Sequence, residues 1–93
     1  MTYLEITLTV RAENRPSAAA VFYRFKQPFL DTVAGALSKE LLVREADVQV
    51  LHVFDTPDHA AAYLDSAFFS NDIVAELAPL LTADPEIRIY HVA

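Results

Sequence analysis

Apolar and polar residues alternate near the start of the chain, and an unbroken apolar run lies in its middle. In residues 3–11 every second side chain, from Leu4 to Val10, is apolar, a period typical of a β-strand with one buried face. Residues 48–54 (VQVLHVF) are rich in β-branched side chains, and Asp55-Thr56-Pro57 ends the run. Because β-branched residues favour strands, we predict that this second segment is a central strand covered on both faces.

The apolar side chains after Pro16 recur at the spacing of a helix. Proline is favoured in the first helical turn, and Asn14 or Arg15 would precede it as the cap. Apolar side chains then recur at helical spacing, which favours a helix packed on the sheet. These side chains are Val21, Phe22, Phe25, Phe29, Leu30 and Val33.

Pro28 lies inside this helical pattern. It removes one backbone donor and clashes with a carbonyl one turn earlier, so the sequence predicts a kink or break between two pieces, residues 17–27 and 29–36. Gly35 stands near the expected helix end, where a left-handed residue is often needed.

Two strands and two helices complete the pattern. Residues 38–44 alternate weakly, as in an edge strand, and a short turn makes them a hairpin with the central strand. Thr56-Pro57 begins a helix that extends to about residue 66, and Ser70 or Asn71 caps another. Residues 86–92 form the last strand.

The order strand, helix, strand, strand, helix pair, strand predicts an α+β fold, a ferredoxin-like β-α-β-β-α-β sandwich. Its helices would cover one face of a four-stranded antiparallel sheet. The other face would carry Thr7, Thr9 and Tyr90 together with apolar residues of the central strand. We expect a second sheet, supplied by a partner, to cover it.

Composition supports one domain, residues 1–93, that forms a homo-oligomer. Ninety-three residues leave no room for a second core, yet 54% of them are hydrophobic, which is more than one small core usually hides. No apolar run approaches the ~20 residues of a membrane-spanning helix. A subunit interface is therefore the better explanation for the surplus.

Charge and residue usage exclude several functions. The formal net charge of −6, with scattered Lys and Arg, argues against nucleic acid as a partner. The chain has no cysteine, and its single glycine excludes glycine-rich phosphate loops. The N-terminus lacks the pattern of a signal peptide, so we expect a cytoplasmic location and no membrane association.

Five stretches resemble the antibiotic-biosynthesis-monooxygenase-like (ABM) domain of the dimeric α/β-barrel superfamily. They are residues 35–43 (GALSKELLV), 51–55 (LHVFD), 62–66 (AYLDS), 77–81 (LAPLL) and 85–90 (PEIRIY). The resemblance implies a homodimer whose two sheets form one eight-stranded barrel with the helices outside. Some members of the family are small oxygenases that need no metal or organic cofactor and oxidise polyphenols, quinols or anthrones.

One departure from the family pattern limits what the resemblance implies. The heme-degrading branch uses an Asn-Trp-His arrangement, but this chain contains no tryptophan. Phe54 stands where many relatives carry that residue. We therefore do not expect heme degradation.

Cofactor-free oxidation needs a base, one or two hydrogen-bond donors and an apolar pocket. His52, among apolar neighbours on the central strand, is the predicted base; the alternative is a structural buried histidine. Tyr63 and Tyr90 are the predicted donors, unless they only pack in the core or an interface. Asn71 would orient the substrate or merely cap a helix, and Arg88 would balance an oxyanion or form an ion pair with an acidic neighbour.

The remaining aromatic residues supply the predicted substrate pocket, which would take a small hydrophobic aromatic ligand. They are Phe22, Phe25, Phe29, Phe54 and Phe68, with His91 beside them. The three histidines lack the spacing of a metal motif, so we expect neither a metal nor a cofactor. The competing functions are a non-enzymatic small-ligand-binding or stress-related homodimer and a purely structural dimer.

Overall fold

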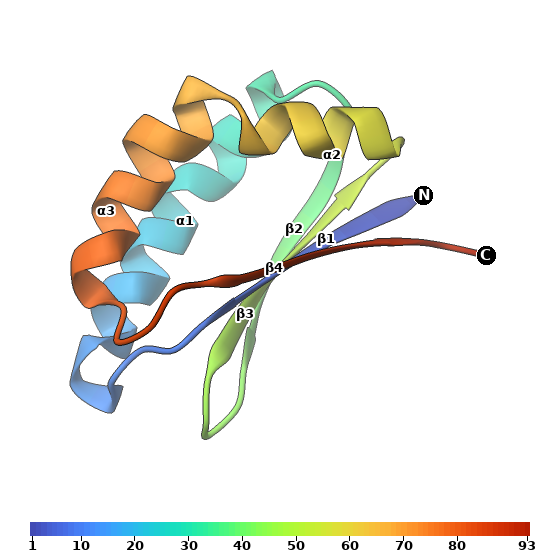
Figure 1. Cartoon of the computed structure of the whole chain (residues 1–93). Helices are drawn as coiled ribbons and strands as arrows, with labels where there is room; N and C mark the ends of the chain where they lie inside the picture. The colour runs from blue at the N-terminus through green and yellow to red at the C-terminus, as the bar shows by residue number, and fades with distance from the viewer.

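The computed structural model describes all 93 residues and shows a four-stranded antiparallel sheet with its helices on one face (Figure 1). The strands lie in the order β2-β3-β1-β4, so β3 and β1 are interior and β2 is an edge. The predicted α+β, ferredoxin-like fold, the hairpin and the edge position of the second strand are therefore confirmed. The strands are β1 (Thr2–Leu8), β2 (Ala36–Val43), β3 (Val48–Phe54) and β4 (Glu86–His91).

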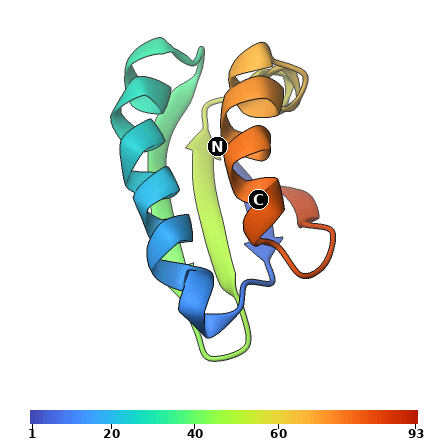
Figure 2. The same cartoon turned by 90° about the vertical axis from the view of Figure 1, so that its left-hand side faces the viewer.

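Two rows of helix cover the sheet and run side by side (Figure 2). The first row is α1 (Arg15–Thr32), which follows the short turn η1 (Ala12–Asn14). The second row begins with α2 (Pro57–Leu64) and continues as the π-helical η2 (Phe68–Val74), α3 (Ala75–Leu77) and η3 (Ala78–Leu80). Membrane crossing would need a longer and more apolar helix than any in this fold.

The register of the strands decides which side chains face the helices. Leu4 pairs with His52 on one side and with Ile89 on the other, and Lys39 pairs with His52 across the hairpin. Paired residues share a face, so these side chains lie on the helix side. Tyr3 and its partner Tyr90 lie on the open side.

Two strands differ in extent from the prediction. The first ends at Leu8 instead of residue 11, because Val10 leaves the sheet and forms an isolated bridge with Leu81. The second begins at Ala36, two residues earlier than predicted, with an irregularity between Ala36 and Ser38. Gly35 has φ +77°, so the predicted left-handed residue after the helix is confirmed.

The predicted division of this helix into two pieces at Pro28 is wrong, because α1 is continuous from Arg15 to Thr32. Proline deprives the helix of one backbone hydrogen bond. Phe29, the next residue, is fully buried, and its packing holds the second half of the helix on the sheet. The Thr32 hydroxyl donates a hydrogen bond of 2.7 Å to the Pro28 carbonyl and supports the last turn.

The predicted helix cap at Ser70 or Asn71 is also wrong. η2 already begins at Phe68 and includes Asn71, which is exposed and makes no capping hydrogen bond. Phe68 and Phe69, predicted as an exposed break, are half-buried against the core. Their burial on the sheet side explains why the helix starts at the aromatic pair instead of at the polar residues.

Candidate functional site

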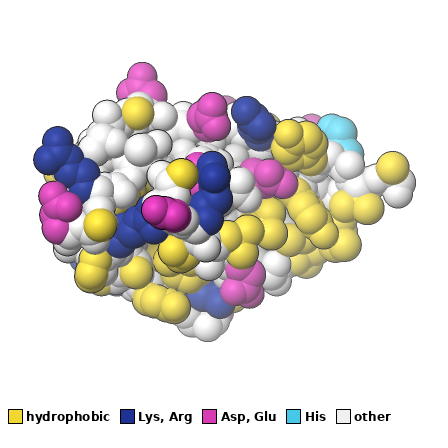
Figure 3. Space-filling model, turned by 90° about the horizontal axis from the view of Figure 1, so that it is seen from below, with side chains coloured by type: hydrophobic (Ala, Val, Ile, Leu, Met, Phe, Trp, Pro, Cys, Tyr) yellow, Lys and Arg dark blue, Asp and Glu magenta, His cyan; other side chains and the backbone are white.

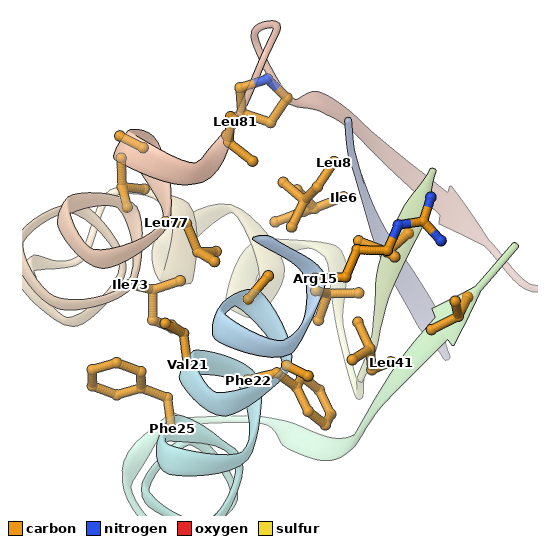
Figure 4. Close-up of a pocket in the computed structure, with 18 of the residues that line it drawn as sticks. Ile6, Leu8, Arg15, Val21, Phe22, Phe25, Leu41, Ile73, Leu77 and Leu81 are labelled. Atoms are coloured by element: carbon orange, nitrogen blue, oxygen red, sulfur yellow. The ribbon is translucent and has the colours of Figure 1, made fainter. Parts of the chain in front are cut away.

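A pocket of about 830 Å³ lies between the helices and the covered face of the sheet. Figure 4 shows its apolar side chains converging from three sides: Ile6 and Leu8 from β1, Phe22 from α1, and Leu77 and Leu81 from the second helical row and the segment after it. Its size falls within the usual range of small-molecule sites. The two helical rows and the sheet therefore leave room for a ligand instead of a filled core.

The pocket wall is apolar with few polar groups. Nineteen of its 26 residues are hydrophobic. Such a wall favours an aromatic or aliphatic ligand, and the polar side chains then decide its orientation. These side chains are Arg15, Lys39, His52, Thr82 and Asp84.

Lys39 is the buried cation of the pocket. Its side chain is on the helix side of β2 and is only 3% exposed. The ammonium nitrogen lies 5.0 Å from the ring centroid of Phe29 and 5.7 Å from that of Phe22, and no acidic side chain pairs with it. Burial lowers the pKa of Lys39 to about 8, so the group is mostly charged at pH 7 and loses its proton only slightly above it.

His52 stands beside Lys39 on the next strand. It is 2% exposed, and its Nδ1 lies 3.0 Å from the carbonyl oxygen of Leu4. Burial, together with the nearby charge of Lys39, lowers the pKa of His52 to about 3. The imidazole is therefore neutral at pH 7, with Nδ1–H donating to Leu4, and Nε2 is its remaining acceptor. A neutral imidazole of this low basicity accepts a hydrogen bond more readily than it removes a proton.

Tyr63, the predicted donor on α2, lies close to His52, with ring centroids 5.5 Å apart. Its hydroxyl is buried and has no hydrogen-bond partner. Burial raises the pKa of Tyr63 far above its ordinary value, so the hydroxyl stays protonated. Tyr63 lines a second, smaller pocket of about 240 Å³, whereas His52 lines the large one.

The other predicted site residues lie elsewhere. Tyr90 and Arg88 are on β4 and share the open side of the sheet with Tyr3 and Glu5, so they face away from the pocket. Arg88 has its amino group 3.8 Å from a carboxylate oxygen of Glu86. The structure thus places His52 and Tyr63 together but separates them from the two residues of the last strand.

Asn71 and His91 are exposed, one on η2 and the other at the end of β4, and neither lines the pocket. Of the predicted pocket phenylalanines, Phe22 and Phe25 line the large pocket. Phe68 lines the small one. The other two belong to the buried cluster around His52, with centroids 5.4 Å (Phe29) and 6.4 Å (Phe54) from it.

Sequence reasoning missed Lys39 and Arg15. Lys39 and Leu41 are two residues apart on β2 and therefore lie on the same, inward face of the strand. A lysine in line with this half-buried leucine was the available signal. Arg15 donates hydrogen bonds of 2.7 and 2.6 Å to the carbonyls of Arg44 and Glu45, while its buried Nε has no partner. Nothing in the sequence links Arg15 to this hairpin.

One acid–histidine pair lies outside the pocket. The Asp55 carboxylate and His59 Nδ1 are 2.6 Å apart on the surface. The hydrogen bond from His59 holds the pKa of Asp55 below its ordinary value. The structure groups no three His, Cys, Asp or Glu side chains in an arrangement that would hold a metal ion.

Comparison with solved structures places this architecture among known folds. A "Putative antibiotic biosynthesis monooxygenase" from Nitrosomonas europaea superposes with a TM-score of 0.83 at 13% identity, covering 99% of this chain and 98% of that one. One of the same description from Caulobacter crescentus gives 0.84 at 18% identity, with 99% and 89% covered. A conserved protein from Methanosarcina mazei gives 0.82 at 15% identity, with 96% and 89% covered.

Sequence comparison adds no nearer relative: no family model matches the chain, and no curated protein does. The structural similarity extends over the whole chain, including β1 and α1, which precede the stretches that resemble the ABM domain. At identities of 13–18% it is a similarity of fold. The chain therefore has the fold of proteins described as antibiotic biosynthesis monooxygenases, and the predicted resemblance is confirmed at that level.

Proposed function

We propose that the large pocket binds a small aromatic, quinol-like substrate and promotes its oxidation by molecular oxygen without a cofactor. The observation that carries this proposal is the pocket of about 830 Å³, whose apolar wall has a lysine and a histidine side by side. The descriptions of two neighbours of the same fold as antibiotic biosynthesis monooxygenases support it.

The proposed reaction draws its electrons from the substrate. In an anthrone-like substrate, the CH₂ group flanked by aromatic rings reacts with O₂ to give a carbonyl and water, so one oxygen atom enters the product and the other leaves as water. The protein must favour loss of a proton from the substrate, stabilise the anion and exclude bulk water. An apolar pocket with few polar groups suits these tasks.

Within this proposal, His52 and Tyr63 act by hydrogen bonding. A neutral His52 accepts a hydrogen bond from a substrate hydroxyl at Nε2, while its contact with Leu4 fixes the ring. Tyr63 lines the small pocket and not the large one, so its unpartnered hydroxyl is a donor only for a ligand that extends beyond the large pocket toward α2. Both groups remain uncharged at pH 7, so neither adds a charge to the apolar pocket.

We also propose that the protein is a homodimer formed through the open face of the sheet. This face carries Leu42 at 46% exposure and Tyr90 at 49%, together with the half-buried Leu51 and Val53 of β3, which pair with Glu5 and Tyr3. The view from below shows hydrophobic side chains with scattered charges among them (Figure 3). A second copy would bury these apolar groups.

The dimer is tested by sedimentation equilibrium of the wild type, Tyr90→Asp and Tyr23→Asp. Tyr23 is also an exposed tyrosine, at 69%, but it lies on α1. We expect the mass of a dimer for the wild type and Tyr23→Asp, and of a monomer for Tyr90→Asp. A wild type that stays monomeric at high concentration contradicts the dimer.

Oxygen uptake tests the proposed reaction. The purified, chelator-treated protein is mixed with hydroquinones and anthrone-like polyphenols, and uptake is compared with the uncatalysed rate. Ala19→Phe fills the pocket, whereas Ala20→Phe changes an exposed neighbour on the same helix that does not line it. We expect saturable uptake in the wild type and Ala20→Phe and loss of uptake in Ala19→Phe. Uptake that never exceeds the uncatalysed rate rejects the oxidation.

A binding function without turnover is the second candidate, because the same pocket would hold a ligand whether or not oxygen reacts. Binding of an aromatic compound that Ala19→Phe abolishes, with no oxygen uptake, would favour this candidate. A pocket that binds none of the compounds would favour a purely structural dimer.

A further inference from the structure

We propose that the pocket binds apolar molecules in their anionic form, with the anionic oxygen at the ammonium group of Lys39. The ligand class is an aromatic phenolate or carboxylate. This inference rests on the proposed function, since it concerns the same pocket, and it specifies the ionisation state of the substrate.

The first argument is that Lys39 is a buried charge without a counter-ion. Its nearest acidic neighbour along β2, Glu40, is directed to Lys26 instead, with 3.7 Å between the charged atoms. The rings of Phe22 and Phe29 lie beside the Lys39 ammonium, which forms no ion pair. A buried cation is usually paired with an anion. Lys39 has no such partner in the protein, and an anionic ligand would supply it.

The second argument concerns the other polar groups of the pocket, which have fewer free hydrogen-bond donors than Lys39. Arg15 uses both terminal nitrogens on the hairpin carbonyls, and the Thr82 hydroxyl donates to the Thr9 carbonyl. Asp84, the one carboxylate in the wall, is on the exposed connection before β4. His52 is neutral. Lys39 is therefore the cation whose charged nitrogen has no hydrogen-bond acceptor, whereas Arg15 keeps only its buried Nε without a partner.

The third argument is energetic. The fold has already removed most of the Lys39 side chain from water, so binding has mainly to desolvate the anion. A cation fixed in an apolar site stabilises developing negative charge more than the same cation in water does. An opposite charge within contact distance lowers the pKa of an acid by about one to three units. A phenol bound at Lys39 should thus ionise more readily than in water.

This state fits the proposed oxidation. A phenolate or enolate gives up an electron to oxygen far more readily than the neutral molecule does. The proton that the neutral molecule loses on forming this anion passes to solvent or to a nearby acceptor. Lys39 then acts as a group that touches the substrate and holds its negative oxygen. The wall supplied by Phe22 and Leu41 contacts the apolar part of the molecule.

The decisive experiment is a pH titration of 7-hydroxycoumarin bound to the protein, followed by the absorbance of its phenolate and carried out without oxygen. The variants are Lys39→Met and, as a matched control, Lys26→Met. Lys26 lies over the same Phe22 ring at 5.8 Å, but it is outside the pocket and pairs with Glu40. 7-Methoxycoumarin, which cannot ionise, measures binding alone.

We expect the wild type and Lys26→Met to lower the pKa of the bound phenol by at least one unit. Lys39→Met should lose this effect and still bind 7-methoxycoumarin. A second arm compares 2-naphthoate with neutral 2-naphthamide, and a tenfold or larger preference for naphthoate that disappears in Lys39→Met assigns the site to carboxylates.

The inference is overturned if the wild type binds neither anion more tightly than its neutral analogue, or if Lys39→Met retains the preference. Because the titrations need no turnover, they are independent of the oxygen-uptake assay. Oxygen uptake unchanged in Lys39→Met would leave the proposed oxidation standing and remove Lys39 from it. An ionised bound phenol without oxygen uptake would support anion binding alone.

Discussion

Replacing Lys39 with methionine should stabilise the protein, and by an amount that depends on pH. The lysine is 3% exposed and has no ion-pair partner, so its charge opposes folding. Methionine has a similar length and no charge, and it fits the space between Phe22 and Phe29. The variant keeps the packing and removes the buried ammonium.

The magnitude follows from the pKa of Lys39, which is 10.5 for an ordinary lysine and about 8 in the folded protein. Each pH unit corresponds to about 1.4 kcal/mol, so the buried charge costs about 3 kcal/mol. Below pH 8 both the folded and unfolded states are protonated, and the cost is present in full. Between pH 8 and 10.5 the unfolded state binds more protons, so the stability of the wild type rises with pH.

Urea unfolding followed by circular dichroism at pH 7, 8, 9 and 10, at one protein concentration, tests this reasoning. We expect Lys39→Met to be more stable than the wild type at pH 7 and the difference to shrink as the pH approaches 10.5. The variant loses the contacts of the ammonium with the two rings, about 1 kcal/mol, which reduces the difference at pH 7. A difference that stays constant from pH 7 to pH 10 would refute the buried charge.

Three further substitutions test the surroundings of the site. Tyr63→Phe removes a buried hydroxyl without a partner and should stabilise the protein by about 1 kcal/mol in urea unfolding; destabilisation would mean that the hydroxyl is hydrogen-bonded. Gly35→Ala puts a side chain at φ +77°, against Asp55 and 2.7 Å from Cγ of His59, and should cost at least 1–2 kcal/mol, so an unchanged melting temperature would contradict it. Phe29→Ala should cost about 3–5 kcal/mol, because the ring is fully buried among aromatic neighbours; a loss below 1 kcal/mol would show that it is not part of the core.

The sequence by itself determined the fold. Alternation over residues 3–11, the β-branched run at 48–54 and the helical spacing after Pro16 were enough for the order of elements, because burial on one face imposes a period of two on strands and of 3.6 on helices. Gly35 marked the helix end, since only glycine takes a left-handed conformation without strain. The sequence also predicted that His52 lies on the central strand.

The continuous helix through Pro28 and the contents of the pocket were decided only by the tertiary structure. A local rule puts a break at Pro28, but the buried Phe29 one residue later holds the helix together. Tyr63 and Tyr90 look equivalent as donors in the sequence, yet the strand register puts Tyr90 on the opposite side of the sheet. Lys39 reads as an ordinary charged residue of an edge strand, and it becomes a buried cation because α1 covers that side of the strand with Phe22 and Phe29. Which side chains share an apolar space, and hence which charges are left without partners, depends on how the layers pack.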